Sequence, residues 1–169
     1  MKANKIDASE ARVSTIQFRV RYQETDQMGV VYHANYFTYF EMGRTELLRE
    51  ASGVSYRDVE ASKTKMVVVK AECSYFKPAR YDDLLTLETR VVGFSFTTIE
   101  HEYRLFRDDV LLVVGRVLLA TVNEQGKVTP VPKWIKELSV KTDGVKTDGV
   151  KTDGVKTDGA KTGDVKGTI

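Results

Sequence analysis

Cysteine and histidine are scarce in this sequence, and their scarcity excludes several kinds of site. Cys73 is the only cysteine, which excludes an internal disulfide and a zinc site made of several cysteines and fits a reducing compartment. We expect Cys73 to be a core thiol rather than a nucleophile. The two histidines, His33 and His101, lie far apart and lack the spacing of zinc ligands, so we expect no metal site even with Asp26 nearby.

The sequence also lacks a strong excess of charge and a long apolar run. Lys and Arg number 26 and Asp and Glu 24, without a long basic block, so we expect no nucleic-acid partner. No apolar run approaches the length of a membrane span, and residues 1–17 lack the apolar segment of a secretory signal. These absences predict a cytoplasmic protein without a membrane span.

The composition changes sharply after residue 139. Residues 140–169 repeat a five-residue unit, mostly VKTDG, without an aromatic residue or a leucine. One valine in most units buries too little surface to offset the entropy of ordering the chain, so we predict a flexible, disordered tail rather than a small β-coil. We therefore expect three parts: an N-terminal extension over residues 1–13, one domain over residues 14–139, and the tail.

Within residues 14–139, hydrophobic periodicity predicts one strand, one long helix and then four strands. The first strand, 14–22, alternates apolar and polar residues, and residues 34–52 place apolar side chains at helical spacing, with Gly53 as a stop. Gly43 on the apolar stripe costs about 1 kcal/mol relative to alanine, which close approach of the helix to a sheet would offset. Runs rich in β-branched and aromatic residues predict the later strands over 64–77, 83–94, 96–106 and 110–123.

One helix and about five strands predict an α+β fold in which an antiparallel sheet curls around the helix. The last strand contains VLLVVGRVLL, which is apolar on both faces, so we expect a second subunit to cover it. His101 is in phase with its apolar neighbours, which predicts a packed, hydrogen-bonded histidine. The segment Tyr81, Asp82 and Asp83 indicates a turn rather than a pair of catalytic carboxylates.

The loop between the first strand and the helix holds an acid, a glycine and a histidine, namely Asp26, Gly29 and His33. The free N–H groups of a helix N-terminus can hold an oxyanion, and a carboxylate beside them can attack a carbonyl carbon or take a proton from water. His33 can position the substrate or share the proton transfer. Asp26 as a simple turn or capping residue is the alternative, because aspartate before a helix is common in that role.

Three motifs, in this order, resemble the hotdog-fold acyl-CoA thioesterases, in particular the 4-hydroxybenzoyl-CoA thioesterase-like group that includes the bacterial YbgC-type enzymes. They are TDQMGVVYHANY at 25–36, YFEMGRTE at 39–46 and YFKPARYDDLLTLET at 75–89. The resemblance implies a hotdog fold, with an antiparallel sheet of about five strands wrapped around one long central helix. It also implies hydrolysis of an acyl-CoA to the free acid and CoA, without a cofactor.

The resemblance also implies roles for particular residues. Asp26 matches the catalytic carboxylate, nucleophile or general base, and His33 matches a second catalytic position that acts through its ring or its backbone N–H. The substrate-binding residues implied by the motif are Gly29, Val30, Tyr32, Ala34, Asn35 and Tyr36. Members of the group form homodimers or homotetramers with the acyl pocket between subunits. The sequence shows no counterpart of the arginine cluster that some members use for the CoA phosphates.

Two other functions are alternatives. Hotdog dehydratases or hydratases acting on acyl thioesters tend to carry a proline-rich HFPxxP-type segment around their histidine. The only prolines here, Pro78, Pro130 and Pro132, are not near His33, which disfavours this reading. A non-catalytic acyl-thioester-binding protein is the second alternative; the presence of Asp26 and His33 speaks against it, and an activity assay decides.

Overall fold

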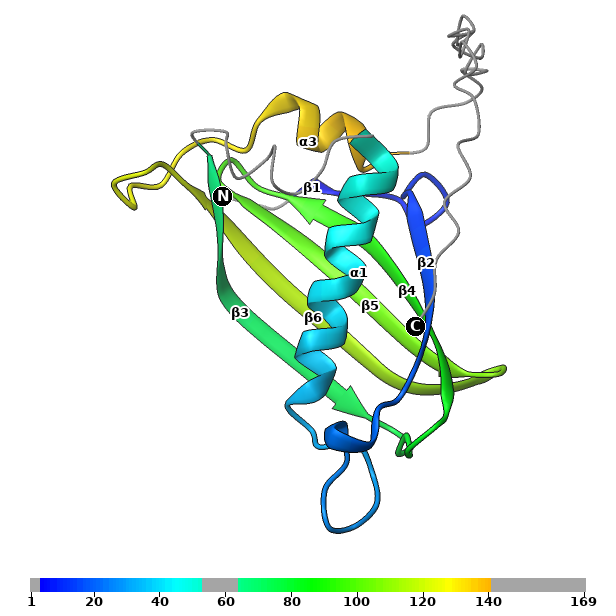
Figure 1. Cartoon of the computed structure of the whole chain (residues 1–169). Helices are drawn as coiled ribbons and strands as arrows, with labels where there is room; N and C mark the ends of the chain where they lie inside the picture. The colour runs from blue at the N-terminus through cyan, green and yellow to red at the C-terminus, as the bar shows by residue number, and fades with distance from the viewer. Residues whose placement is uncertain (1–3, 53–63, 141–169) are drawn as a thin grey trace, which may run out of the picture.

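The computed structural model describes residues 4–52 and 64–140 of the 169-residue chain. The predicted helix stop at Gly53 and all of the predicted tail except Val140 lie outside these residues. The elements are β1 (Asn4–Lys5), β2 (Val13–Arg19), the 3-10 helix η1 (Tyr22–Glu24), α1 (Asn35–Ser52), β3 (Lys65–Tyr75), β4 (Leu84–Phe94), β5 (Thr98–Arg107), β6 (Val110–Val122) and α3 (Lys133–Leu138) (Figure 1).

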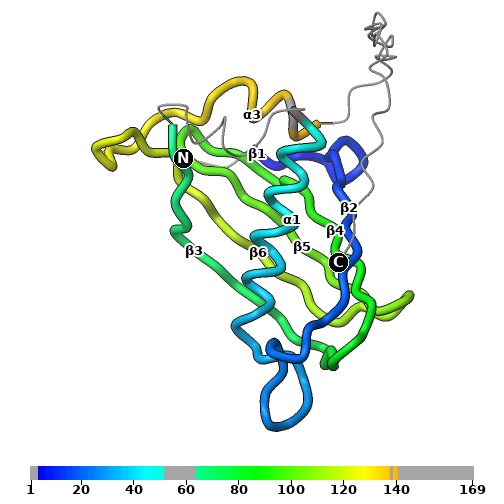
Figure 2. Tube along the Cα trace, viewed as in Figure 1, coloured from blue at the N-terminus to red at the C-terminus, as the bar shows by residue number. Residues whose placement is uncertain are grey.

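The strands form one antiparallel sheet of six, in the order β1-β4-β5-β6-β3, with β2 also paired to β4. The helix α1 lies along one face of the sheet and packs against β2, β4 and β5 (Figures 1 and 2). The five predicted strands, the long helix and the hotdog arrangement are confirmed. Part of the predicted extension, Asn4–Lys5, forms β1 and pairs with the end of β4. None of the described helices has the length and hydropathy needed to cross a bilayer.

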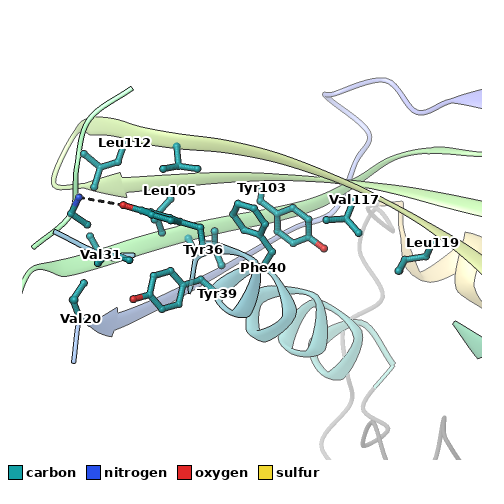
Figure 3. Packing of buried hydrophobic residues seen from close by; sticks show 14 residues of the cluster. Val20, Val31, Tyr36, Tyr39, Phe40, Tyr103, Leu105, Leu112, Val117 and Leu119 are labelled. Carbon is teal, nitrogen blue, oxygen red and sulfur yellow. Dashed lines mark hydrogen bonds between the residues drawn. The ribbon is translucent and has the colours of Figure 1, made fainter. Parts of the chain in front are cut away.

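The core fills the space between α1 and the inward face of the sheet. The helix contributes aromatic side chains, and β4, β5 and β6 contribute mostly leucine and valine, because alternate residues of each strand face the helix (Figure 3). Phe40 of α1 stacks on Tyr103 of β5, with ring centroids 4.6 Å apart. Cys73 packs against this cluster, and burial raises the pKa of its thiol, which agrees with a core role.

Two glycines let α1 lie close to the sheet. A Cβ atom at Gly43 would lie 2.2 Å from Thr89 Oγ1 and 2.8 Å from Leu87 Cδ2. A Cβ atom at Gly115 of β6 would lie 2.3 Å from Cε2 of the Phe40 ring. The close approach predicted for Gly43 is therefore confirmed. The second contact comes from a strand distant in the chain and was not predicted.

The inward face of the sheet also holds buried polar atoms. His101 is buried, as predicted, and desolvation together with the Arg44 cation lowers its pKa to about 3, so the ring is neutral near neutral pH. The prediction of a hydrogen-bonded ring finds no support at Nδ1, which has no hydrogen-bond partner among residues 4–52 and 64–140. Three more buried atoms have no hydrogen-bond partner within the described residues: Arg44 Nε, Thr89 Oγ1 and the Tyr103 hydroxyl. These atoms lie in the layer between α1 and β4–β5.

Candidate active site

The loop from η1 to α1 is closed on itself by backbone hydrogen bonds. Thr25 and Val31 form an isolated antiparallel bridge, and inside it Asp26 N donates to Val30 O at 2.9 Å. Gly29 N donates to Asp26 O at 2.9 Å, and Gly29 has φ +69°, a left-handed conformation that favours glycine. The loop is thus a defined turn that presents Asp26 at its first corner.

The carboxylate of Asp26 is half-buried and only partly engaged. Its Oδ1 accepts a hydrogen bond from Met28 N at 2.8 Å. Within the described part of the chain, its Oδ2 accepts none. One oxygen therefore fixes the orientation of the group, as in an Asx turn, while the second is free to act on a substrate or a water molecule.

Glu24 joins this loop to the start of α1. Its backbone carbonyl accepts hydrogen bonds from Tyr32 N at 2.9 Å and Asn35 Nδ2 at 2.7 Å. Its carboxylate accepts from the Tyr39 hydroxyl at 2.9 Å and from Arg21 N at 2.7 Å. The side-chain amide of Asn35, which the motif assigned to substrate binding, is therefore engaged in holding the loop.

The end of β3 and the turn that follows it hold the other side of the loop. Tyr75 donates its hydroxyl to His33 O at 3.0 Å, and Val31 N donates to Ala79 O at 2.8 Å. Ala79 N in turn donates to the Tyr36 hydroxyl at 3.4 Å, the dashed line in Figure 3. Burial raises the pKa of Tyr36, so this hydroxyl keeps its proton near neutral pH.

A groove runs between the loop and the end of β3. The described residues that line it are Val30, Val31, His33, Tyr36, Tyr75, Phe76, Lys77 and Pro78. Of the residues that the motif predicts, the structure brings Val30, His33 and Tyr36 into this wall. Asp26, Gly29, Tyr32, Ala34 and Asn35 lie in the same loop or first helical turn but are not among the lining residues.

The backbone at His33 is suited to polarise a carbonyl. Tyr75 fixes the carbonyl of His33, and within residues 4–52 and 64–140 the N–H of His33 donates no hydrogen bond. The ring is exposed and lies against Tyr32, with ring centroids 4.4 Å apart. A free N–H beside a helix N-terminus can stabilise a developing oxyanion, and a carboxylate in the same loop can act as base or nucleophile.

Sequence reasoning gave no site role to Glu24, to Tyr75 at the end of β3 or to residues 76–78 after it. Tyr75 and His33 are 42 positions apart, so no local pattern reveals their contact. Glu24 sits directly before the TD motif, but its role needs the position of Tyr39, which only the folded helix supplies. In the described residues, no group of three His, Cys, Asp or Glu side chains is placed to hold a metal ion.

Comparison with known proteins identifies the family. Residues 20–138 match the model of the thioesterase-like superfamily. The YbgC protein of Haemophilus influenzae, named an acyl-CoA thioesterase, is 40% identical over 120 residues, which cover 70% of this chain and 88% of that protein. A probable thioesterase from Bartonella henselae has a TM-score of 0.66 at 35% identity, covering 72% of this chain and all of that one.

A 4-hydroxybenzoyl-CoA thioesterase solved with 4-hydroxybenzoyl-CoA has a TM-score of 0.71, covering 76% of this chain and 99% of that one. At 19% sequence identity this likeness shows the fold alone. The family model and the YbgC relative identify the family, and this structure shows the same fold. The chain belongs to the thioesterase-like superfamily and has its hotdog fold.

Proposed function

We propose that this protein hydrolyses the thioester bond of an acyl-CoA to give a free acid and CoA. The observation that carries the proposal is the 40% identity to an acyl-CoA thioesterase across the domain that contains Asp26 and His33. The loop geometry supports it, because a carboxylate with one free oxygen lies in the same loop as the backbone N–H of His33, which donates no hydrogen bond within the described residues. A cytoplasmic location stays a prediction.

In the proposed reaction, the thioester carbonyl lies in the groove with its oxygen toward the His33 N–H. Asp26 either attacks the carbonyl carbon, giving an anhydride that water then opens, or removes a proton from a water molecule that attacks directly. The C–S bond breaks in both routes, and CoA leaves as the thiolate and takes up a proton. An oxyanion donor of this kind is worth about 3–4 kcal/mol in the transition state.

The direct test is release of free thiol from short-chain, long-chain and aromatic acyl-CoAs. We expect turnover of at least one class, and the best substrate identifies the acyl group. If no thiol appears across the panel while the protein remains folded, the proposal is wrong. The same protein would then be assayed for hydration or dehydration of acyl thioesters and for binding without turnover.

We also propose that the active form is a homodimer or homotetramer built through β3. In the described residues β3 pairs only with β6, so its other edge is open. Three consecutive valines, Val67, Val68 and Val69, are 42%, 54% and 53% exposed there. An apolar open edge is a template for pairing with another strand. A second copy of the chain suits it, because the groove lies at the end of β3 and would then border the interface.

Val68→Lys should convert the assembly to a monomer and lower kcat/KM, because the open edge would carry a charge that pairing has to bury. Sedimentation and thiol release on the same preparation measure both effects. Val128→Lys is the matched control, since Val128 is 55% exposed and lies outside β3. A monomeric wild-type protein, or an unchanged assembly in Val68→Lys, would contradict the proposal.

A further inference from the structure

Two Arg-Tyr pairs, distant in the sequence, meet beside the candidate active site. Arg21 and Tyr22 follow the end of β2, with Tyr22 opening η1, and Arg80 and Tyr81 stand in the turn before β4. Backbone hydrogen bonds join these segments, from Val20 N to Asp83 O at 3.0 Å and from Asp82 N to Val20 O at 3.1 Å. Both pairs therefore lie at the end of the sheet where the Asp26 loop projects (Figure 1).

The two tyrosine rings form an exposed corner. Their centroids are 5.6 Å apart and their planes meet at 88°. Tyr22 is 77% exposed and Tyr81 is 57% exposed, so the pair contributes little to the core. A flat aromatic ligand can stack on the face of one ring while the other ring borders its edge. Stacking on exposed aromatic side chains is how proteins bind nucleobases without reading their sequence.

The charges around this corner favour an anion. Of the acids near the corner, Asp82 pairs with Arg19 at 3.6 Å and Asp83 with Arg107 at 2.8 Å. The carboxylate of Glu24 accepts hydrogen bonds from Arg21 N and the Tyr39 hydroxyl. Arg21 and Arg80 form no ion pair with any residue of the described ranges. Two arginines without an ion pair, each next in sequence to one of the two tyrosines, suit a ligand that carries both phosphate and a base.

The corner is also connected to the catalytic loop. Arg80 Nη1 donates to Gly29 O at 3.4 Å, three residues after Asp26. Lys77, which lines the groove, likewise forms no ion pair among residues 4–52 and 64–140. Lys77 at the groove and Arg80 against the loop thus carry positive charge on both sides of the candidate site.

We propose that Tyr22 and Tyr81, together with Arg21 and Arg80, bind the adenine nucleotide of the CoA substrate. The inference rests on the proposed function and assigns the nucleotide contacts that the sequence left unassigned. The two Arg-Tyr pairs are far apart in the sequence, and the hydrogen bonds of Val20 with the turn before β4 bring them together. The proposal also selects the carrier: coenzyme A carries an adenine, whereas the phosphopantetheine arm of an acyl carrier protein does not.

The test compares an acyl-CoA, the matching acyl-pantetheine and the matching acyl carrier protein as substrates. In Tyr22→Ala/Tyr81→Ala we expect KM for the acyl-CoA to rise about tenfold or more, with kcat little changed, because the lost contacts lie away from the reacting bond. Hydrolysis of the acyl-pantetheine, which has no nucleotide, should be unaffected. Phe96→Ala is the control, since Phe96 is also 58% exposed but follows the opposite end of β4.

Three outcomes would overturn the inference: equal loss on acyl-CoA and acyl-pantetheine, no loss on either, or loss confined to the acyl carrier protein. Binding of CoA itself, measured by calorimetry, keeps the inference separate from the proposed function. Suppose that wild type hydrolyses none of the substrates, that it still binds CoA, and that the double variant binds CoA about tenfold or more weakly. The nucleotide site then stands and the thioesterase proposal fails. If wild type hydrolyses acyl-CoA and the double variant binds CoA equally well, only the nucleotide site fails.

Discussion

Asp26→Asn should lower kcat by about 10²-fold or more, the range that loss of a general base or nucleophile commonly produces. The substitution keeps the size of the side chain, and the amide oxygen can still accept the hydrogen bond from Met28 N. The amide can neither attack a carbonyl carbon nor take a proton from water. Steady-state thiol release with the best acyl-CoA measures the loss.

Two comparisons make this result specific to Asp26. Asp82→Asn removes an exposed carboxylate of the neighbouring turn, outside the groove, and should leave kcat within a few-fold of wild type. Thermal unfolding of Asp26→Asn should match wild type, since its backbone hydrogen bonds to the loop remain. If kcat of Asp26→Asn equals that of the wild-type protein, Asp26 is neither the nucleophile nor the general base.

Gly115→Ala should lower the free energy of unfolding by about 1–3 kcal/mol, the usual cost of overpacking a core. The added Cβ would lie 2.3 Å and 2.4 Å from two atoms of the Phe40 ring. This ring is fully buried and stacked on Tyr103, so it cannot turn away freely. Without this contact, alanine would stabilise a strand interior relative to glycine. The steric contact is therefore the reason why we expect the free energy of unfolding to fall.

Denaturant unfolding of Gly115→Ala, Phe40→Leu and the double variant tests this explanation as a cycle. The ring atoms nearest the new Cβ are absent in Phe40→Leu, so the alanine should cost less in that background. Equal costs in both backgrounds would show that Phe40 is not the reason for the glycine. We expect the slope of the unfolding free energy against urea concentration to be the same in all variants, since a changed slope would make the comparison invalid.

Much of the fold could be predicted because long elements carry strong periodic signals. The five strands and α1 each extend over enough residues for alternating or helical spacing to be clear. The three missed elements are short: β1 has two residues, η1 has three and α3 has six. β1 is a strand only because the end of β4 offers it a partner, and no local sequence pattern records that.

The candidate site was predictable only on the side formed by residues 26–36, to which the first motif gives roles. The turn at Gly29, the half-buried carboxylate of Asp26 and the position of His33 at the helix start all lie within a dozen residues. The opposite wall of the groove, Tyr75 to Pro78, depends on how β3 is paired in the sheet. The free Nδ1 of buried His101 likewise depends on packing, because a strand pattern gives burial but not the hydrogen-bond partner.

The turn between β3 and β4 limits how this candidate site can diverge among related proteins. Ala79 exchanges hydrogen bonds with both Val31 and Tyr36, and the next residue, Arg80, contacts Gly29. An insertion or deletion in this turn would break all three contacts at once and displace the catalytic loop. Changes of acyl preference should therefore arise by exchange of side chains such as Val30 or Phe76 in the groove wall, at constant turn length.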